Sequence, residues 1–387
     1  MLDFKTILWA VLIAIIVGLL SAFFLFSLDF VTQLRDEHHW FIFALPFAGF
    51  LWGLLYLRLG NEGSSGNEVF IHAYEDSAVK VSWRMAPLVF LGTLISHVFG
   101  ASAGREGAAV QMGGSVAAQL ARFYPCSLAE KRLLLLMGIG AGFAAVFGTP
   151  LAGFVFAFEF FWTKENLSQA AIPVFLASFL AHFVCLFCGV HHTVFPAIVL
   201  PDLSFGVVFK VMIAGVIFGL TARLYITVSK YFTQLLAYVQ SLPLRLMLAG
   251  FIMAILVWYF KAYEYIGLGI PGIIHAFEEP QAFYVFAIKI FFTALTLSAG
   301  FKGGEVTPLF FIGASVGSAL VWIIPLPLTF LAALGLVAVF AGAANTPLAC
   351  ICLGAELFGA NILIYAAIVC ICAFLSSALV NFHRNFH

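Results

Sequence analysis

Charged residues are scarce in this chain. Asp, Glu, Lys and Arg make up only 9% of its 387 residues, whereas about a quarter of the residues in soluble domains are charged. The 18 basic and 18 acidic side chains cancel, so no net positive charge suggests a nucleic-acid partner. Because 63% of the residues are hydrophobic, an ordinary soluble protein is excluded. The low charge and the high hydrophobic content predict an integral membrane protein.

Long apolar runs predict that α-helices cross the membrane. A membrane barrel would instead show short segments of alternating polarity, and the first run lacks the cleavage pattern of a signal peptide. We therefore expect an all-α polytopic membrane protein. Only about fifteen residues follow the last apolar core, so we expect no cytoplasmic regulatory domain. The runs of spanning length lie at about 5–27, 40–57, 86–103, 205–228, 245–260 and 281–299.

One cysteine motif raises the question of a metal site. Cys185 and Cys188 form a C-x-x-C pair, and His191 and His192 follow closely. A structural zinc site would need a second cysteine pair nearby, which the sequence lacks. Metal binding stays an alternative, but we expect packing thiols, no metal and no cofactor.

Three segments recur in the same order about 200 residues further along the chain. The ordered set predicts a duplicated unit, with one repeat at about 30–195 and a second at about 205–380. Membrane transporters often place two such repeats in opposite orientations, with the substrate site between them. The matching segments are 66–76 with 269–279, 112–120 with 312–320, and 149–161 with 346–358.

Some of the repeated segments are too short to span a bilayer. The stretches 108–120 and 150–162 each hold about thirteen residues and begin at turns rich in Gly or Pro. A helix that begins inside the membrane exposes unpaired N–H groups and the positive end of its dipole, which together bind anions. Such starts are expected after Gly66, Gly107 and Gly304 and near Tyr365.

Three motifs resemble signatures of the CLC family of anion channels and proton-coupled anion antiporters. They are GREGAAVQMGG (104–114), GIGAGFAAVFGTPLAGFVFAFE (138–159) and GGEVTPLFFIGASVG (303–317). The resemblance covers about 60–380, in register and in order. It implies a CLC-like inverted-repeat fold with tilted and partly spanning helices, a single transmembrane domain over residues 1–387, and a homodimer.

The resemblance assigns the gating and proton-carrying carboxylate of the family to Glu106. At a helix start, the same dipole and amide groups that attract an anion hold this carboxylate, so the two compete. Arg105 is expected to tie loop carbonyl groups. The alternative is a simple buried pair of Arg105 and Glu106, although adjacent residues on a helix do not face each other. The repeat register places Val306 opposite Glu106, and Gly107 beside the anion.

The chain departs from the common family pattern at several positions. Asn67 replaces the usual serine of the first anion loop, and Phe70 replaces its proline. Glu305 and Thr307 stand where the second signature usually has an apolar and a small residue. No Asp or Glu occurs from 166 to 201, where the usual internal proton glutamate is expected. At each departure the chain resembles the fluoride branch of the family.

The departures suit fluoride chemically. Fluoride is small and hard and holds its water tightly, so it needs strong hydrogen-bond donors, and the Asn67 amide and the Thr307 hydroxyl are such donors. Glu305 supplies a second carboxylate near the pore, and ionisable groups inside a membrane are functional by default. The alternative for Glu305 and Thr307 is a helix N-terminal cap without a transport role.

Two aromatic residues complete the expected anion site. The family places a pore tyrosine at the start of its last helix, which suggests Tyr365, the only tyrosine after Tyr284. The alternative for Tyr365 is an interfacial belt position. The positive ring edge of Phe70 could face the anion.

The sequence therefore predicts a multi-pass fluoride/proton antiporter of the inner (plasma) membrane that exports fluoride and has no enzymatic activity. The alternative is a chloride/proton antiporter or a voltage-gated-type chloride channel of the same family. An intramembrane protease is a different class, and Ser96 and His97 are adjacent in sequence. Neighbours on a helix cannot form the required contact, and no third group is evident.

Overall fold

The computed structural model of the protein describes residues 4–59, 66–124, 126–162 and 167–382. Every regular element in these ranges is helical, which confirms the predicted fold class. Six helices in the described part of the chain are long and apolar enough to cross a membrane. The α-helices are α1 (Phe4–Glu37), α2 (Leu45–Leu59), α3 (Glu68–Glu75), α4 (Met85–Val98), α5 (Glu106–Phe123), α6 (Leu128–Phe147), α7 (Pro150–Phe161), α8 (Leu167–Phe187), α9 (Phe205–Ala237), α10 (Leu242–Phe260), α11 (Ile270–Glu278), α12 (Tyr284–Ala299), α13 (Val306–Ala319), α14 (Leu328–Ala344), α15 (Pro347–Phe358) and α16 (Leu363–Phe382).

Two of the predicted spans are shorter than expected. The run at 86–103 forms α4, with 14 residues, and the run at 281–299 forms α12, with 16 residues, whereas an upright span needs about 20. Both helices end early because Gly100 and Gly300 follow them with positive φ angles of 83° and 105°.

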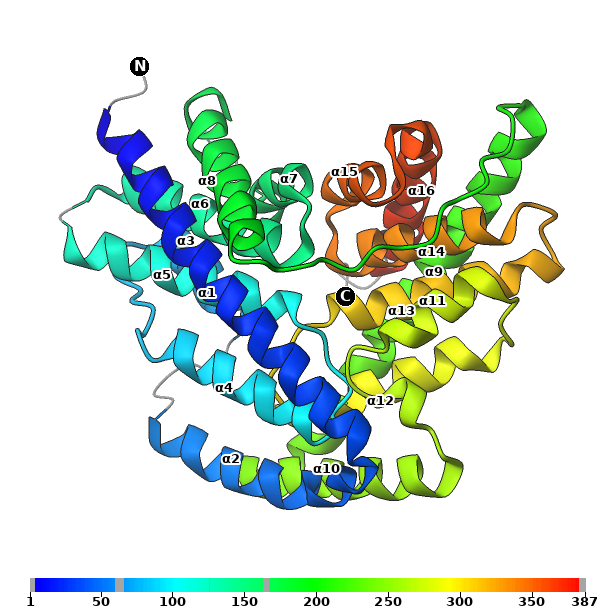
Figure 1. The fold of residues 1–387 in the computed structure, drawn as a ribbon, viewed down its shortest axis with the longest axis horizontal. Coiled ribbons are helices and arrows are strands. Elements are labelled where there is room, and N and C mark those ends of the chain that lie inside the picture. The colour runs from blue at the N-terminus through cyan, green and yellow to red at the C-terminus, as the bar shows by residue number, and fades with distance from the viewer. Residues whose placement is uncertain (1–3, 60–65, 125, 163–166, 383–387) are drawn as a thin grey trace.

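The lengths of other helices also differ from the apolar runs. The prediction missed the long helices at Gln169–Phe187 and Ala360–Ala378. Pro173 lies inside the first of these, which argues in sequence terms against a continuous helix. α1 has 34 residues, too many for an upright span, and it runs diagonally across the molecule in Figure 1.

Glycines allow the helices behind the two signature motifs to pack backbone against backbone. A Cβ atom at Gly113 of α5 would collide with the carbonyl oxygen of Gly138 of α6. The second half repeats this contact between Gly313 of α13 and Gly335 of α14. Small residues permit such close helix contacts inside membranes. The contacts fix the directions of α5 and α13, whose N-terminal ends form the site described below.

α7 and α15 each place a glutamate on the N-terminus of the other, and Figure 1 shows them side by side near the middle of the molecule. Glu356 accepts hydrogen bonds from the N–H groups of Leu151 and Ala152, both at 2.8 Å. Glu159 likewise accepts from two N–H groups at the start of α15, at 2.9 and 2.7 Å. These reciprocal contacts give Glu159 and Glu356 a structural role at the helix N-termini. The division of the whole chain into two repeats stays a prediction.

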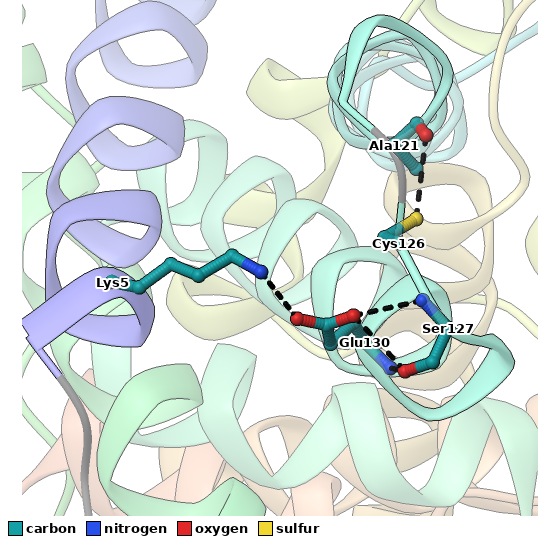
Figure 2. A network of polar contacts seen from close by, with 5 residues as sticks. All are labelled: Lys5, Ala121, Cys126, Ser127 and Glu130. Atoms are coloured by element: carbon teal, nitrogen blue, oxygen red, sulfur yellow. Dashed lines mark hydrogen bonds and ion pairs between the residues drawn. The ribbon is translucent and has the colours of Figure 1, made fainter.

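The start of α6 is fastened to the first helix. Figure 2 shows Lys5 of α1 reaching Glu130, with 2.5 Å between the ammonium nitrogen and the carboxylate oxygen. Glu130 and Ser127 form a reciprocal capping box at the N-terminus of α6, and the Cys126 thiol donates to a backbone carbonyl close by. This network ties α1 to the end of α6 that also supports α3.

α3 is short and is held by basic side chains at its C-terminal end. The Lys131 ammonium lies 2.9 to 3.2 Å from three carbonyl oxygens in the turn that follows α3. Arg132 Nε donates to the carbonyl oxygen of Tyr74 at 2.7 Å. Cations at a helix C-terminus satisfy its unpaired carbonyl groups and complement its dipole. These contacts position the opposite end of α3, where Asn67 lies.

We predict that Glu356→Ala lowers the free energy of unfolding by about 2 kcal/mol, because two N–H groups of α7 lose a charged acceptor. Chemical unfolding of purified protein in detergent measures this change. Glu279→Ala is the matched control, since that side chain is 75% exposed. Equal stability of the two variants would show that the reciprocal glutamates do not brace α7 and α15.

Candidate functional site

Two signature loops meet through a pair of backbone hydrogen bonds. The N–H group of Gly104 donates to the carbonyl oxygen of Gly304 at 2.5 Å, and the N–H group of Gly304 donates back at 2.7 Å. This antiparallel bridge joins the loop before α5 to the loop before α13. The N-termini of two buried helices are therefore brought together, and their dipoles and free N–H groups favour negative charge at this point.

Glu106 places a carboxylate at the N-terminus of the other half's helix. Its side chain is 2% exposed, and Oε2 accepts from the backbone N–H groups of Thr307, at 3.2 Å, and Arg105, at 3.1 Å. The Thr307 hydroxyl donates to Oε1. The predicted register put Val306 opposite Glu106, but the hydrogen bonds fall one residue later. A carboxylate with these partners occupies a site that suits an anion.

Glu305 lies at the N-cap of α13 but does not cap it. Its side chain makes no capping hydrogen bond. Instead, Oε2 accepts from the hydroxyl of Tyr225 on α9 at 2.9 Å. The interpretation of Glu305 as a helix cap alone is therefore wrong. Thr307, in contrast, donates both its N–H group and its hydroxyl to the Glu106 carboxylate.

Glu106 and Glu305 line one cavity of about 780 Å³. Asn67 also lines it, at the N-cap of α3, where its side chain makes no capping hydrogen bond. Three of the predicted anion contacts, at Asn67, Gly107 and Val306, thus share a wall with both carboxylates. The other charged residues on this wall are Glu68, Glu159 and Lys302.

Two predicted anion contacts, Phe70 and Tyr365, do not line the large cavity. Phe70 is fully buried and its ring packs against α5 at Gly114, while Ile71 takes its place on the cavity wall. Phe70 lies on the face of α3 that packs against the core. The Tyr365 hydroxyl donates to the carbonyl oxygen of Pro201 at 2.8 Å, and Tyr365 is absent from the cavity wall. α16 starts at Leu363, so the predicted start near Tyr365 exists, but it does not point the hydroxyl at Glu106.

Two contacts of the site were not predicted. Tyr225 is the partner of Glu305, and its signal in the sequence was a phenol inside an apolar spanning run. Arg105 was expected to tie loop carbonyls, but its Nη2 donates to the hydroxyl of Thr193 at 3.5 Å, and its side chain bonds no carbonyl group of the described residues. Thr193 lies in a segment without periodic pattern, so nothing in the sequence indicated this contact. Among the described residues, no group of three or more His, Cys, Asp or Glu could hold a metal ion.

Comparison with known proteins identifies the family. A model described as "Voltage gated chloride channel" matches residues 48–378. A "Chloride/fluoride channel protein" of Pseudomonas syringae pv. tomato is 44% identical over 376 residues, which cover 95% of this chain and 82% of the relative. The chain belongs to the voltage-gated chloride channel (CLC) family.

Solved structures support the same placement within the CLC family. A structure described as a CLC-type fluoride/proton antiporter matches with a TM-score of 0.93 and 30% identity, and covers 97% of both chains. A slow cyanobacterial Cl⁻/H⁺ antiporter shares the fold, with a TM-score of 0.83, 19% identity and coverage of 98% and 96%. Among the relatives found by sequence, an H⁺/Cl⁻ exchange transporter of Cronobacter sakazakii is 28% identical over 273 residues, which cover 66% of this chain and 57% of the relative.

We predict that Glu106→Ala uncovers an anion site. Removing the carboxylate frees the donors of Thr307, so a halide can replace it. Added fluoride should then stabilise this variant more than the wild type, by about 1 kcal/mol once its concentration exceeds the dissociation constant several-fold. Thermal unfolding in detergent, with gluconate as the control anion, measures the difference. The same halide response in both proteins would contradict the assignment.

Proposed function

We propose that this CLC protein is a secondary active transporter that exchanges fluoride for protons across the membrane. One observation carries the proposal: the backbone and side chain of Thr307 hold the Glu106 carboxylate at the N-terminus of α13, a position that suits an anion. A proton that neutralises Glu106 removes its attraction to these donors. An anion then competes successfully for them, so proton binding and anion binding become linked at one place.

Glu305 is proposed as the second proton-carrying group. It lines the same cavity as Glu106, and its partner is a phenol hydroxyl, which can orient a carboxylate without neutralising it. The segment from 166 to 201 offers no carboxylate for this task. Glu305 thus places a titratable group on the same cavity wall as Glu106.

Fluoride is the proposed anion because the donors near the gate are strong and polar. The Asn67 amide at the cavity wall and the Thr307 hydroxyl can replace part of the water that a small hard anion loses. The 44% identical relative is named a chloride/fluoride channel protein, and the 30% identical structure is a fluoride/proton antiporter. A chloride/proton antiporter or a passive chloride channel is the alternative within the family, and the second carboxylate favours coupled exchange.

The proposed direction and setting follow from the chemistry of the exchange. A proton gradient directed into the cell would drive fluoride outward, so the protein would export fluoride from the cytoplasm through the inner (plasma) membrane. The exposed apolar side chains of its long helices suit contact with lipid. The homodimer is proposed from the family resemblance alone.

Glu305→Gln tests the proton route. This change keeps the size of the side chain and the acceptor for Tyr225, but it removes the titrating group. We expect the number of protons moved per fluoride to fall by roughly tenfold or more. Fluoride electrode and pH recordings on the same liposomes measure both fluxes, and Glu279→Ala serves as the control. An unaltered ratio in Glu305→Gln would remove Glu305 from the proton route.

Asn67→Ser tests the choice of anion. The shorter hydroxyl cannot reach as far into the cavity as the amide, so fluoride loses a donor that chloride needs less. We expect the ratio of chloride flux to fluoride flux to rise roughly tenfold. Parallel efflux measurements with the two anions give this ratio. If folded Asn67→Ser keeps the ratio of the wild type, Asn67 stands outside the anion path.

A further inference from the structure

A second, much smaller cavity lies beside the gate. Its volume is about 20 Å³, and Glu106 is the only residue that it shares with the large cavity among the described parts of the chain. The Glu106 carboxylate therefore stands between the two spaces. We call the small one the gate chamber. Its polar wall consists of Arg105, Glu106, Thr193 and Thr307, and three phenylalanines contribute to its apolar wall: Phe147, Phe195 and Phe310.

The gate chamber is large enough for one water molecule or one ion of similar size. A cavity needs roughly 10–15 Å³, measured in the same way, to hold one water. A bare fluoride ion is about as large as water, whereas a bare chloride ion is larger and a hydrated halide is larger still. The gate chamber thus suits fluoride that has lost its water.

The walls of the gate chamber supply what a dehydrated anion needs. The Arg105 guanidinium is 12% exposed, and its Nε is buried without a hydrogen-bond partner. The Nε lies 3.6 Å from the nearer Glu106 oxygen, which leaves this donor free for a ligand. Thr193 accepts from Arg105 Nη2 at 3.5 Å, so the hydroxyl proton of Thr193 is free to donate elsewhere. Ring edges carry partial positive charge and add to this environment.

We propose that the gate chamber is a binding site for one dehydrated fluoride ion, held by the Arg105 guanidinium and the Thr193 hydroxyl on the side of Glu106 away from the large cavity. This inference rests on the proposed fluoride/proton exchange and deepens it. Because Glu106 lines the gate chamber, its ionised carboxylate repels an anion there, and its neutral form does not. The fluoride ion therefore occupies the gate chamber only while the gate carries a proton, which ties each anion step to a proton step.

An extended strap, residues 190–204, contributes Thr193 and Phe195 to the wall of the gate chamber. It connects α8 to α9 and crosses the molecule between its two halves in Figure 1. Phe195 of the strap packs against Phe277, with ring centroids 6.2 Å apart, and against Phe358, at 5.8 Å. The second half also holds the strap through Tyr365, whose hydroxyl donates to Pro201. The hydrogen bond from Tyr365 to Pro201 thus anchors the segment that carries Thr193.

The Thr193 hydroxyl is tested with a matched pair of variants. Thr193→Val keeps the shape but loses the donor, and Thr193→Ser keeps the donor. We expect Thr193→Val to raise the KM for fluoride roughly tenfold in liposome flux assays, and Thr193→Ser to stay near the wild type. Equal KM values for the two variants, with both folded, would overturn the proposal.

The size limit is tested at Phe195. Phe195→Ala enlarges the gate chamber, so the ratio of chloride flux to fluoride flux should rise several-fold. Phe358→Ala is the control, because Phe358 belongs to the same aromatic cluster but does not line the gate chamber. An equal shift in both variants would mean that looser packing, and not chamber size, changes the ratio.

The same assays separate this inference from the proposed function. Wild-type protein that moves fluoride without protons would reject the proposed exchange itself. Wild-type exchange that remains fluoride-selective and proton-coupled, together with unchanged Thr193→Val and Phe195→Ala, would reject only the gate chamber as an anion site.

Discussion

The two backbone hydrogen bonds between Gly104 and Gly304 are the constraint on which the functional centre depends. They hold the first residues of α5 and α13 against each other, so a side chain that begins one helix reaches the N-terminus of the other. Glu106 uses this proximity to bind the N–H group and hydroxyl of Thr307. The carboxylate thereby satisfies donors that would otherwise attract an anion, as expected of the gate that we propose.

The two pairs of carboxylates at equivalent positions in the chain differ in their contacts. Glu159 and Glu356 are reciprocal, and each binds two N–H groups of the other's helix. At the gate the reciprocity is broken. Glu106 binds the start of α13, whereas Glu305 turns to the hydroxyl of Tyr225. A symmetric pair stabilises both helices equally and has no reason to move. In the asymmetric pair, Glu106 binds the donors of Thr307 and Glu305 binds a phenol hydroxyl, while both line the large cavity.

Much of the fold and part of the site could be predicted from the sequence. The apolar runs predicted an all-α membrane protein. The family signatures contain Glu106, Glu305 and Thr307, which the structure places at the starts of α5 and α13. Helix ends were predicted poorly, since positive φ angles at Gly100 and Gly300 stop α4 and α12 within apolar runs.

Other misses arose from contacts between distant parts of the chain. Phe70 and Tyr365 were placed by motif position alone, yet the face of a helix that meets the core is decided by its neighbours. Phe70 meets Gly114, and Tyr365 meets Pro201. Neither Thr193 nor its bond to Arg105 leaves any pattern in the sequence, because the strap that carries it is irregular and takes its position from the second half.

We propose that Glu106 couples the two ions: its ionised carboxylate competes with fluoride for the donors of Thr307, and its protonation favours fluoride binding. The most direct measurement uses liposomes that contain either the purified wild type or Glu106→Gln, with an outward fluoride gradient and no pH gradient. A pH-sensitive dye inside and a fluoride electrode outside follow both ions together. The account predicts that fluoride efflux drives protons inward through the wild type against their electrochemical gradient, and that Glu106→Gln moves no protons. Uphill proton movement that persists in Glu106→Gln would contradict it.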